Sequence, residues 1–128
     1  MLKKFEAVKL IVDKDENHND FEKSILQCKN DSIMVISGLN GRLDQTFQNL
    51  HLMYKYADRF KISLMDEYSL LTLIDKGKTC YIPDFSWEDR KGCGFFSLES
   101  NCLKTDGFKW NVSEKDDIVF GTYISSSN

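Results

Sequence analysis

SIMVISGLNGRLDQ, residues 32–45, is the segment that decides the fold of the first half of the chain. It contains a continuous apolar run, residues 33–36, which is typical of a strand that is buried on both faces. Two glycines, Gly38 and Gly41, then indicate a turn. We expect a helix after the turn, because apolar side chains recur at steps of three and four residues: Leu43, Phe47, Leu50, Met53, Tyr54 and Ala57.

The segments on either side continue this alternation. Residues 8–12 form a short β-type run, apolar residues between 21 and 26 recur at helical spacing, and residues 60–65 indicate another strand. The order strand–helix–strand–helix–strand is typical of a parallel sheet with crossover helices. Residues 1–65 are therefore predicted to form a partial α/β domain with a parallel sheet.

The pattern changes after Asp66. Short β-type runs then recur between turns rich in Gly, Asp, Asn and Ser, at residues 68–74, 79–82, 93–98, 108–112 and 118–124. Residues 66–128 are therefore predicted to form an antiparallel β-sandwich that is incomplete at its C-terminus. The parallel sheet predicted before them is narrow and leaves apolar faces uncovered. We expect the chain to be a piece of a larger fold, or to have a partner that covers these faces.

The composition excludes several classes of protein. The 128 residues are 41% hydrophobic and 29% charged, and 17 basic against 20 acidic residues give a net charge of −3. The scattered basic residues create no field that would recruit nucleic acid. No segment approaches the roughly 20 apolar residues of a membrane helix, and four cysteines without a C-x-x-C pair indicate no zinc site. Because the N-terminus has no signal-peptide pattern, we expect a cytoplasmic protein.

An acidic segment, residues 13–20, follows the first predicted strand at its carboxyl end, where open α/β sheets place their ligands. Carboxylates such as those of Asp15 and Asp20 suit Mg²⁺, which takes few protein ligands and shares the others with phosphates and water. The alternative is a helix cap, since Asn19 followed by Glu22 has the spacing of a capping box. Both interpretations stay open.

The turn at residues 37–45 is a candidate phosphate site. Backbone N–H groups at the start of a helix attract phosphate, and glycines such as Gly41 let it approach closely. Arg42 adds a bidentate donor for phosphate oxygens, although an arginine at a helix N-terminus opposes the helix dipole. The segment matches neither G-x-G-x-x-G nor a P-loop, so the alternative is a turn that only begins a helix.

Two segments in the second half can bind an organic ligand. Trp110, beside a polar turn, can stack on a flat cationic ring, although a tryptophan in a β-rich segment more often lies in the core. The hydroxyl groups of residues 121–128 can hydrogen bond to a ligand, or they can simply end a polar strand.

Together, these four segments resemble the thiamine pyrophosphokinase family. The family pattern has an acidic segment that ends in Thr-Asp-Phe, and DENHNDF at residues 15–21 is similar to it. Its Gly-Gly-Leu-x-Gly-Arg-x-Asp-Gln turn resembles residues 37–45, and its Leu-Lys-Trp-Asn resembles residues 108–111. Its late Phe-Gly-Thr-x-x-Ser-x-Ser-Asn resembles residues 120–128. The motifs occur in order and cover nearly the whole chain. The resemblance implies that residues 1–65 are the second half of a Rossmann-like nucleotide-binding domain and that residues 66–128 are a thiamine-binding β-sandwich domain.

The resemblance implies transfer of the pyrophosphoryl group of ATP to the hydroxyl of thiamine, which gives thiamine diphosphate and AMP. It also implies Mg²⁺ bound by Asp15 and Asp20, and a homodimer with the active site at the subunit interface. The implied catalytic residues are Asp20, Arg42 and Asp44. The implied ATP-binding residues are Gly41, Arg42, Asp44 and Gln45, and the implied thiamine-binding residues are Trp110, Ser125, Ser127 and Asn128.

Departures from the family pattern affect this expectation. The family's Ala-Asp-Gly-Gly and Gly-Asp-x-Asp-Ser stretches, which supply most of the metal carboxylates, have no match here. Glu16, Asn17 and Ser37 stand where Gln, Asp and Gly are usual. We therefore expect a fragment that lacks the family's N-terminal part and C-terminal end, and that is weak or inactive alone. The alternatives are a non-catalytic thiamine- or nucleotide-binding partner of a full-length subunit, and a protein whose motifs serve only folding.

Overall fold

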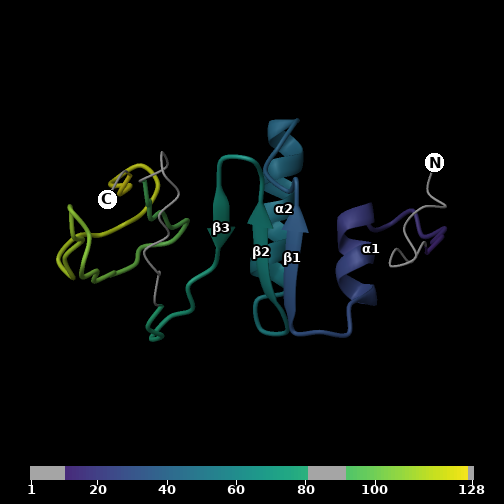
Figure 1. The fold of residues 1–128 in the computed structure, drawn as a ribbon, viewed down its shortest axis with the longest axis horizontal. Coiled ribbons are helices and arrows are strands. Elements are labelled where there is room, and N and C mark those ends of the chain that lie inside the picture. The colour runs from purple at the N-terminus through teal and green to yellow at the C-terminus, as the bar shows by residue number, and fades with distance from the viewer. Residues whose placement is uncertain (1–10, 81–91, 127–128) are drawn as a thin grey trace. The chain divides into compact units, whose positions relative to one another are not determined.

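The computed structural model describes residues 11–80 and 92–126, and the chain divides into two compact units between residues 80 and 81. The two helices and two strands predicted between residues 21 and 65 are confirmed. Neither helix in the described part of the chain is long and apolar enough to span a membrane. The elements are α1 (Asp20–Gln27), β1 (Ser32–Ile36), α2 (Leu43–Lys55), β2 (Lys61–Met65) and β3 (Leu70–Thr72) (Figure 1).

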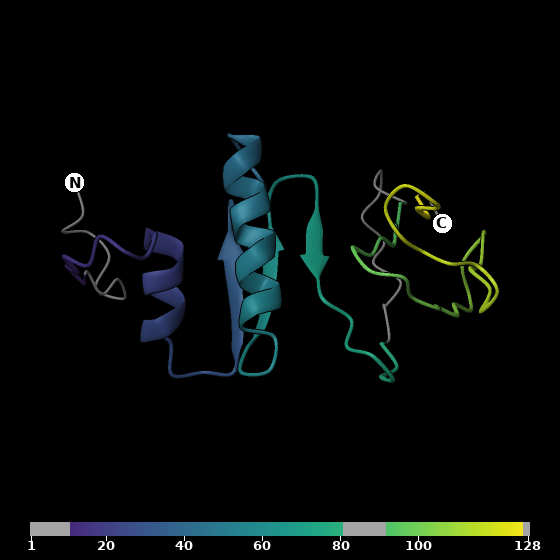
Figure 2. The ribbon, with the colours of Figure 1, turned by 180° about the vertical axis from the view of Figure 1, so that it is seen from behind.

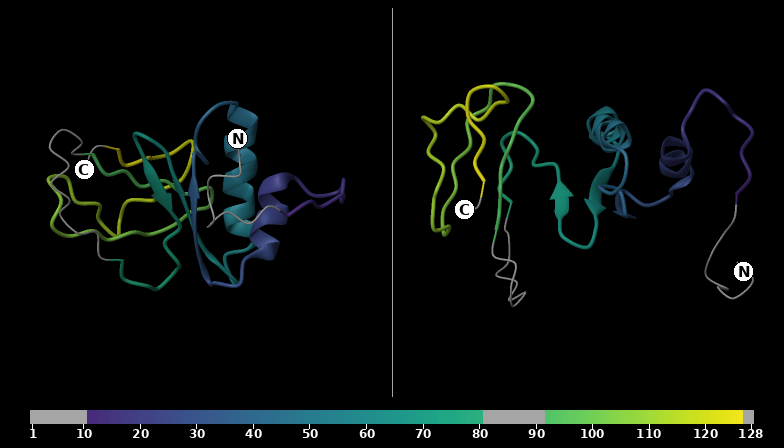
Figure 3. Two further views of the ribbon diagram at one scale, coloured as in Figure 1. Left: turned by 45° about the vertical axis from the view of Figure 1, so that its right-hand side comes forward. Right: turned by 90° about the horizontal axis from the view of Figure 1, so that it is seen from above.

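Strands β1 and β2 are parallel, and helix α2 connects them. Their register pairs Ile33 with Ile62 and Val35 with Leu64, so these four apolar side chains share one face of the sheet. Helix α2 lies over one face of the sheet, and α1 lies beside α2 (Figure 3). Parallel strands need a crossover connection of this kind. This part of the α/β prediction is therefore confirmed.

Strand β3 is antiparallel to β2, so the sheet is mixed. The turn between them is held by Asp66, whose Oδ1 accepts hydrogen bonds from the backbone N–H groups of Tyr68 (2.7 Å) and Ser69 (2.6 Å). An aspartate turn of this kind reverses the chain within a few residues. The β-type run at residues 68–74 is predicted to open the sandwich, but residues 70–72 instead complete the first sheet.

The strand predicted at residues 8–12 is not found in its described part. Ile11 and Val12 belong to no strand, and Val12 is 80% exposed; residues 8–10 lie outside the described residues. An apolar run becomes a strand only where a neighbouring strand supplies hydrogen bonds. In the described residues the sheet has two parallel strands rather than three.

The core of the first unit is formed by the helices and the face of the sheet that they cover. The face predicted for α2 is only partly correct, because Met53 is buried while Leu43, Phe47 and Tyr54 are 70%, 54% and 43% exposed. Apolar residues extend around more than one face of α2, so their spacing alone does not identify the face that meets the sheet. The buried cluster is Ile25, Leu52, Met53, Phe60, Ile62 and Leu64.

The other face of the sheet is covered by neither helix: the sheet stands in front of α2 in Figure 1 and behind it in Figure 2. Met34, Ile36 and Leu70 share this face, since their cross-strand partners are Ser63 and Met65. They are 56%, 80% and 56% exposed. The prediction that residues 33–36 form a strand buried on both faces is therefore wrong, because neither helix covers this face of β1. A narrow sheet is expected to leave apolar surface uncovered, and the exposure of these side chains in the first unit agrees with that expectation.

The second unit has no assigned helix or strand within residues 92–126, so the predicted β-sandwich does not appear there. A strand needs successive ladder bonds to a neighbour, and here the chain makes isolated bridges instead. These bridges are antiparallel, which is the direction that the prediction requires. They pair Phe95 with Ser125, Cys102 with Asp117, and Val119 with Tyr123.

Candidate functional site

Both helices of the first unit begin at the end of the sheet where β1 and β2 finish (Figures 1 and 2). Asp20 is the first residue of α1, Arg42 is the N-cap of α2, and Asp44 and Gln45 lie in the first turn of α2. The fold therefore brings these candidate metal- and ATP-binding residues to one end, called the phosphate edge below. Helix N-termini carry partial positive charge, so this edge suits anions. A cavity of about 190 Å³ at the end of α2 and β3 is lined by none of them.

The loop from β1 to α2 is fastened to the elements around it. The backbone N–H of Ser37 donates to the carbonyl of Met65 (2.7 Å), and the side-chain amide of Asn49 donates to the carbonyl of Gly38 (2.8 Å). A Cβ added at Gly38 would lie 3.1 Å from Cδ2 of Leu64. The loop packs this closely on the core only because position 38 has no side chain.

Two residues of this loop, Ser37 and Gly41, have positive φ angles of 65° and 95°. The left-handed conformation costs a residue with a side chain roughly 1–2 kcal/mol, and it costs glycine almost nothing. Ser37 stands where the family pattern usually has glycine, and its φ angle explains that preference. No atom lies within 4 Å of the position that a Cβ of Gly41 would take, so this part of the loop is open.

The guanidinium of Arg42 forms a bidentate ion pair with the carboxylate of Asp44. Nε of Arg42 lies 3.0 Å from Oδ1 of Asp44, and Nη2 contacts Oδ2. The two side chains are 75% and 63% exposed. The hydrogen bonds to Arg42 lower the pKa of Asp44, and those to Asp44 raise the pKa of Arg42. Asp44 therefore orients the guanidinium and offsets its unfavourable position at a helix N-terminus.

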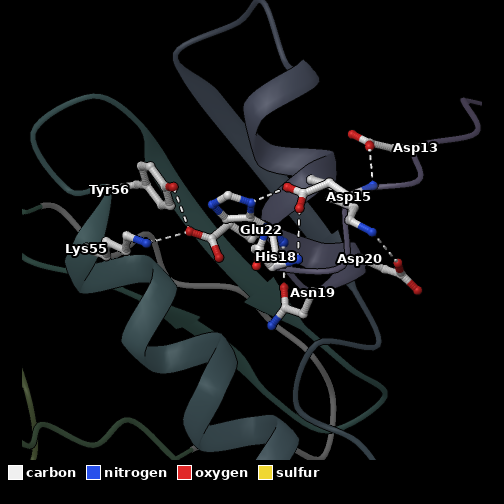
Figure 4. Close-up of polar contacts among 10 residues, drawn as sticks. Asp13, Asp15, His18, Asn19, Asp20, Glu22, Lys55 and Tyr56 are labelled. Atoms are coloured by element: carbon white, nitrogen blue, oxygen red, sulfur yellow. Dashed lines mark hydrogen bonds and ion pairs between the residues drawn. The ribbon is translucent and has the colours of Figure 1, made fainter.

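The acidic segment is folded by hydrogen bonds from its own side chains (Figure 4). Oδ1 of Asp13 accepts from the N–H of Asp15 (2.9 Å), and Oδ1 of Asp15 accepts from the N–H of Asn17 (2.8 Å). The second carboxylate oxygen of Asp15 contacts Nδ1 of His18. The bond to His18, followed by the bond to Asn17, lowers the pKa of Asp15. Sequence reasoning missed this role of His18.

The interpretation of this segment as a helix cap is confirmed in part. Oδ1 of Asn19 accepts a hydrogen bond from the N–H of Glu22 (2.7 Å). The buried carboxylate of Glu22 instead accepts from Nζ of Lys55 (2.6 Å) and from the hydroxyl of Tyr56 (2.7 Å). These bonds lower the pKa of Glu22, and the bond to Lys55 has the largest effect. They tie the start of α1 to the end of α2, a contact that no local spacing in the sequence could indicate.

Asp20, the other candidate ligand for Mg²⁺, has a fully exposed carboxylate that lies 3.9 Å from Nζ of Lys23. Asp15 points toward His18 rather than toward Asp20 (Figure 4). Across residues 11–80 and 92–126, no group of three His, Cys, Asp or Glu side chains could hold a metal ion. The chemistry of these carboxylates suits an Mg²⁺ ion that takes its other ligands from phosphates and water. Asp20 is available for this, whereas Asp15 would have to leave His18.

Trp110 is 63% exposed, so the alternative that it belongs to the core is wrong. Nζ of Lys109 lies 5.5 Å from the centroid of its ring. An exposed indole can accept a flat ring against its π face.

Ser125 differs from Trp110 in being buried, and its backbone exchanges two hydrogen bonds with that of Phe95, 2.7 and 3.0 Å long. The ring of Phe95 packs edge to face on that of Phe108, with centroids 5.6 Å apart. Phe108 precedes Trp110 by two residues, so the second unit connects the two segments that the resemblance assigns to thiamine. Ser127 and Asn128 lie outside the described residues.

Two models of known protein families match the chain. Residues 1–65 match the thiamin pyrophosphokinase catalytic domain, and residues 74–128 match the thiamin pyrophosphokinase vitamin B1 binding domain. The chain belongs to the thiamin pyrophosphokinase family. The catalytic-domain match includes the phosphate edge, and the vitamin B1 binding match includes Trp110 and Ser125. The resemblance carried by the four motifs is therefore confirmed.

Curated relatives show the same similarity. Thiamine pyrophosphokinase 2 of Oryza sativa subsp. japonica is 29% identical over 129 residues, which cover 89% of this chain and 48% of the relative. Thiamine pyrophosphokinase of Saccharomyces cerevisiae is 32% identical over 104 residues, which cover 76% of this chain and 33% of the relative. Thiamine pyrophosphokinase 1 of Arabidopsis thaliana is 28% identical over 89% of this chain and 46% of its own length. The chain thus spans about half, or less, of the length of these thiamin pyrophosphokinases.

Proposed function

We propose that the chain serves in the transfer of the pyrophosphoryl group of ATP to the primary hydroxyl of thiamine, which gives thiamine diphosphate and AMP. The observation that carries the proposal is the exposure of Trp110 within the segment that matches a vitamin B1 binding domain. An indole that is 63% exposed contributes little to the core of its own unit, so most of its surface is available to a ligand. The phosphate edge provides the corresponding place for ATP.

At the phosphate edge, the chain's own residues bind and orient the triphosphate. Backbone N–H groups near Gly41 and in the first turn of α2, the side chain of Gln45, and the guanidinium of Arg42 are the donors. Asp44 holds Arg42 in place by its bidentate pair. The hydroxyl group of thiamine loses its proton to water as its oxygen bonds to the β-phosphorus of ATP. The bond from that phosphorus to the oxygen of AMP breaks, and AMP leaves. Positioning and charge stabilisation supply most of the catalysis in such a transfer.

Asp20, with Asp15 once it leaves His18, would hold Mg²⁺ at this edge. When bound, the ion neutralises negative charge on the phosphates. The full exposure of the Asp20 carboxylate, at the first residue of α1, supports this role.

In the second unit, Trp110 stacks on the aromatic rings of thiamine, whose positive charge favours the π face of an indole. Ser125, Ser127 and Asn128, which the resemblance also implies, are the other residues that we propose for thiamine binding. As the resemblance implies, we propose a homodimer with its active sites at the subunit interface. We also propose the cytoplasm as its location and the second unit as part of a β-sandwich.

A second candidate function is a non-catalytic, thiamine- or nucleotide-binding partner of a full-length subunit. Two observations favour it: Trp110 is exposed and can contact thiamine, whereas the carboxylate of Asp15, a proposed metal ligand, is bonded to His18. In this form the chain completes a binding pocket but contributes little to the chemistry.

The test is to incubate the purified chain with ATP, Mg²⁺ and thiamine, and to separate the products by chromatography. Thiamine diphosphate and AMP in equal amounts support the enzyme, with weak turnover expected. Thiamine binding without product supports the non-catalytic partner. If the chain neither binds thiamine nor forms product, both proposals are contradicted. Arg42→Ala should reduce ATP binding by about tenfold. The matched control is Arg59→Ala, an exposed arginine outside the phosphate edge.

A further inference from the structure

The loop that carries Trp110 is closed at its base by the backbone and by an ion pair. The N–H of Thr105 donates to the carbonyl of Val112 (3.1 Å), and the N–H of Val112 donates to the hydroxyl oxygen of Thr105 (2.7 Å). Just outside this segment, Nζ of Lys104, one residue before Thr105, lies 3.4 Å from Oε1 of Glu114, two residues after Val112. Val112 is buried, so the base of the loop is anchored in the second unit.

The side chain of Asn111 bonds across the tip of the loop. Its Oδ1 accepts a hydrogen bond from the backbone N–H of Phe108 (3.1 Å), on the far side of the turn. The same oxygen accepts from the hydroxyl of Thr105 (3.4 Å), which in turn accepts from Val112. A single carbonyl oxygen therefore joins the start, the middle and the end of residues 105–112.

Trp110 lies inside the segment that this oxygen closes, between Phe108 and Asn111. Its indole is 63% exposed, so packing against the core does little to fix its direction. Asparagine side chains stabilise turns by bonding to backbone N–H groups a few residues away. The bonds of Asn111, together with the packing of Phe108 on Phe95, give the exposed indole a fixed base. A fixed platform loses less entropy on binding than a mobile one.

We propose that Asn111 is a positioning residue for Trp110, which clasps residues 105–112 through its side-chain oxygen and presents the indole to the thiamine ring; this rests on the proposed function. The clasp requires only an acceptor oxygen at the δ position. Asn111→Asp retains that oxygen and Asn111→Ala removes it, so the two variants separate the clasp from any other effect of changing the residue.

The test uses the full chain with Trp87→Phe, which leaves Trp110 as its single tryptophan. Fluorescence anisotropy of Trp110 without ligand reports the local mobility of the indole. Asn111→Ala should lower the anisotropy and weaken thiamine binding by about tenfold, the worth of a hydrogen bond. Asn111→Asp should keep the anisotropy of the parent. Asn101→Ala, at an exposed asparagine that bonds through its backbone, is the matched control and should change neither.

The clasp would be overturned if the anisotropy of Asn111→Ala equalled that of the parent. It would also be overturned if Asn111→Asp and Asn111→Ala lowered the anisotropy equally. Amide exchange at Phe108 gives a second measurement, and it should quicken in Asn111→Ala alone. If thiamine does not bind to the parent, the proposed function fails. The anisotropy and exchange results still decide the clasp, because neither needs a ligand.

Discussion

The ring of Phe108 lies edge-on against the ring of Phe95, with the two planes at 84°. Phe95 is bonded through its backbone to the buried Ser125, and Phe108 begins the turn that ends in Trp110 and Asn111. Such pairs contribute about 0.5–1.5 kcal/mol beyond the area they bury. This contact is therefore a physical connection between two of the four motifs that identify the family.

A double-mutant cycle of Phe95→Leu and Phe108→Leu tests this contact. Each change keeps an apolar side chain but removes the ring, so the coupling energy isolates the edge-to-face interaction. We expect a coupling of about 1 kcal/mol in the free energy of unfolding, measured by urea denaturation. Strictly additive effects would show that the rings do not meet.

Ser37→Gly should stabilise the chain. It removes the strain of a side chain at a φ of 65°, and this gain exceeds the greater flexibility of glycine in the unfolded state. The expected gain is about 0.5–1 kcal/mol in the free energy of unfolding. Ser32→Gly, in strand β1, is the matched control and should instead destabilise by a similar amount. Destabilisation by both changes would argue against the left-handed conformation of Ser37.

The two faces of the sheet should respond differently to truncation. Leu64→Ala removes a fully buried side chain and should cost about 3 kcal/mol of stability. Ile36→Ala, on the uncovered face, should change stability by no more than about 0.5 kcal/mol. Thermal and urea unfolding of the two variants make the comparison. A cost at Ile36 equal to that at Leu64 would mean that something covers the open face in solution.

The ion pair at the phosphate edge predicts a pH dependence. Because Arg42 lowers the pKa of Asp44 below its ordinary value of 3.8, the pair contributes stability above that pH. The contribution is lost as the pH falls through the lowered pKa. Carbon-13 NMR of the Asp44 carboxyl should show a higher pKa in Arg42→Gln than in the parent. Added salt should reduce the difference, since both groups are exposed. Equal pKa values of Asp44 in the parent and in Arg42→Gln would contradict the ion pair.

Sequence reasoning succeeded where the signal is local. The apolar run before Ser37 and the periodicity after Arg42 predict β1 and α2, because a short apolar strand and an amphipathic helix each leave a pattern in consecutive residues. The same reasoning places Arg42 and Asp44 at a helix start. Four motifs in a fixed order carry more information than any of them alone, and they identified the family.

The rest of the fold depends on contacts between distant segments. Whether residues 70–72 join the first sheet is decided by the turn at Asp66, and which face of α2 is buried is decided by where the sheet lies. The partners of Glu22 are 33 and 34 residues away on another helix. The exposure of Trp110 is also a tertiary property, and composition alone favours the core for a tryptophan.

Calorimetric titration of thiamine into the parent chain and into Trp110→Ala tests the central claim most directly. The account predicts that Trp110→Ala weakens thiamine binding by about tenfold or more, the worth of one stacked ring, and leaves ATP binding within twofold of the parent. Leu98→Ala, at a half-exposed side chain of the same unit, is the matched control and should leave both affinities unchanged. Unchanged thiamine affinity in Trp110→Ala, or an equal loss of thiamine and ATP binding, would contradict the account.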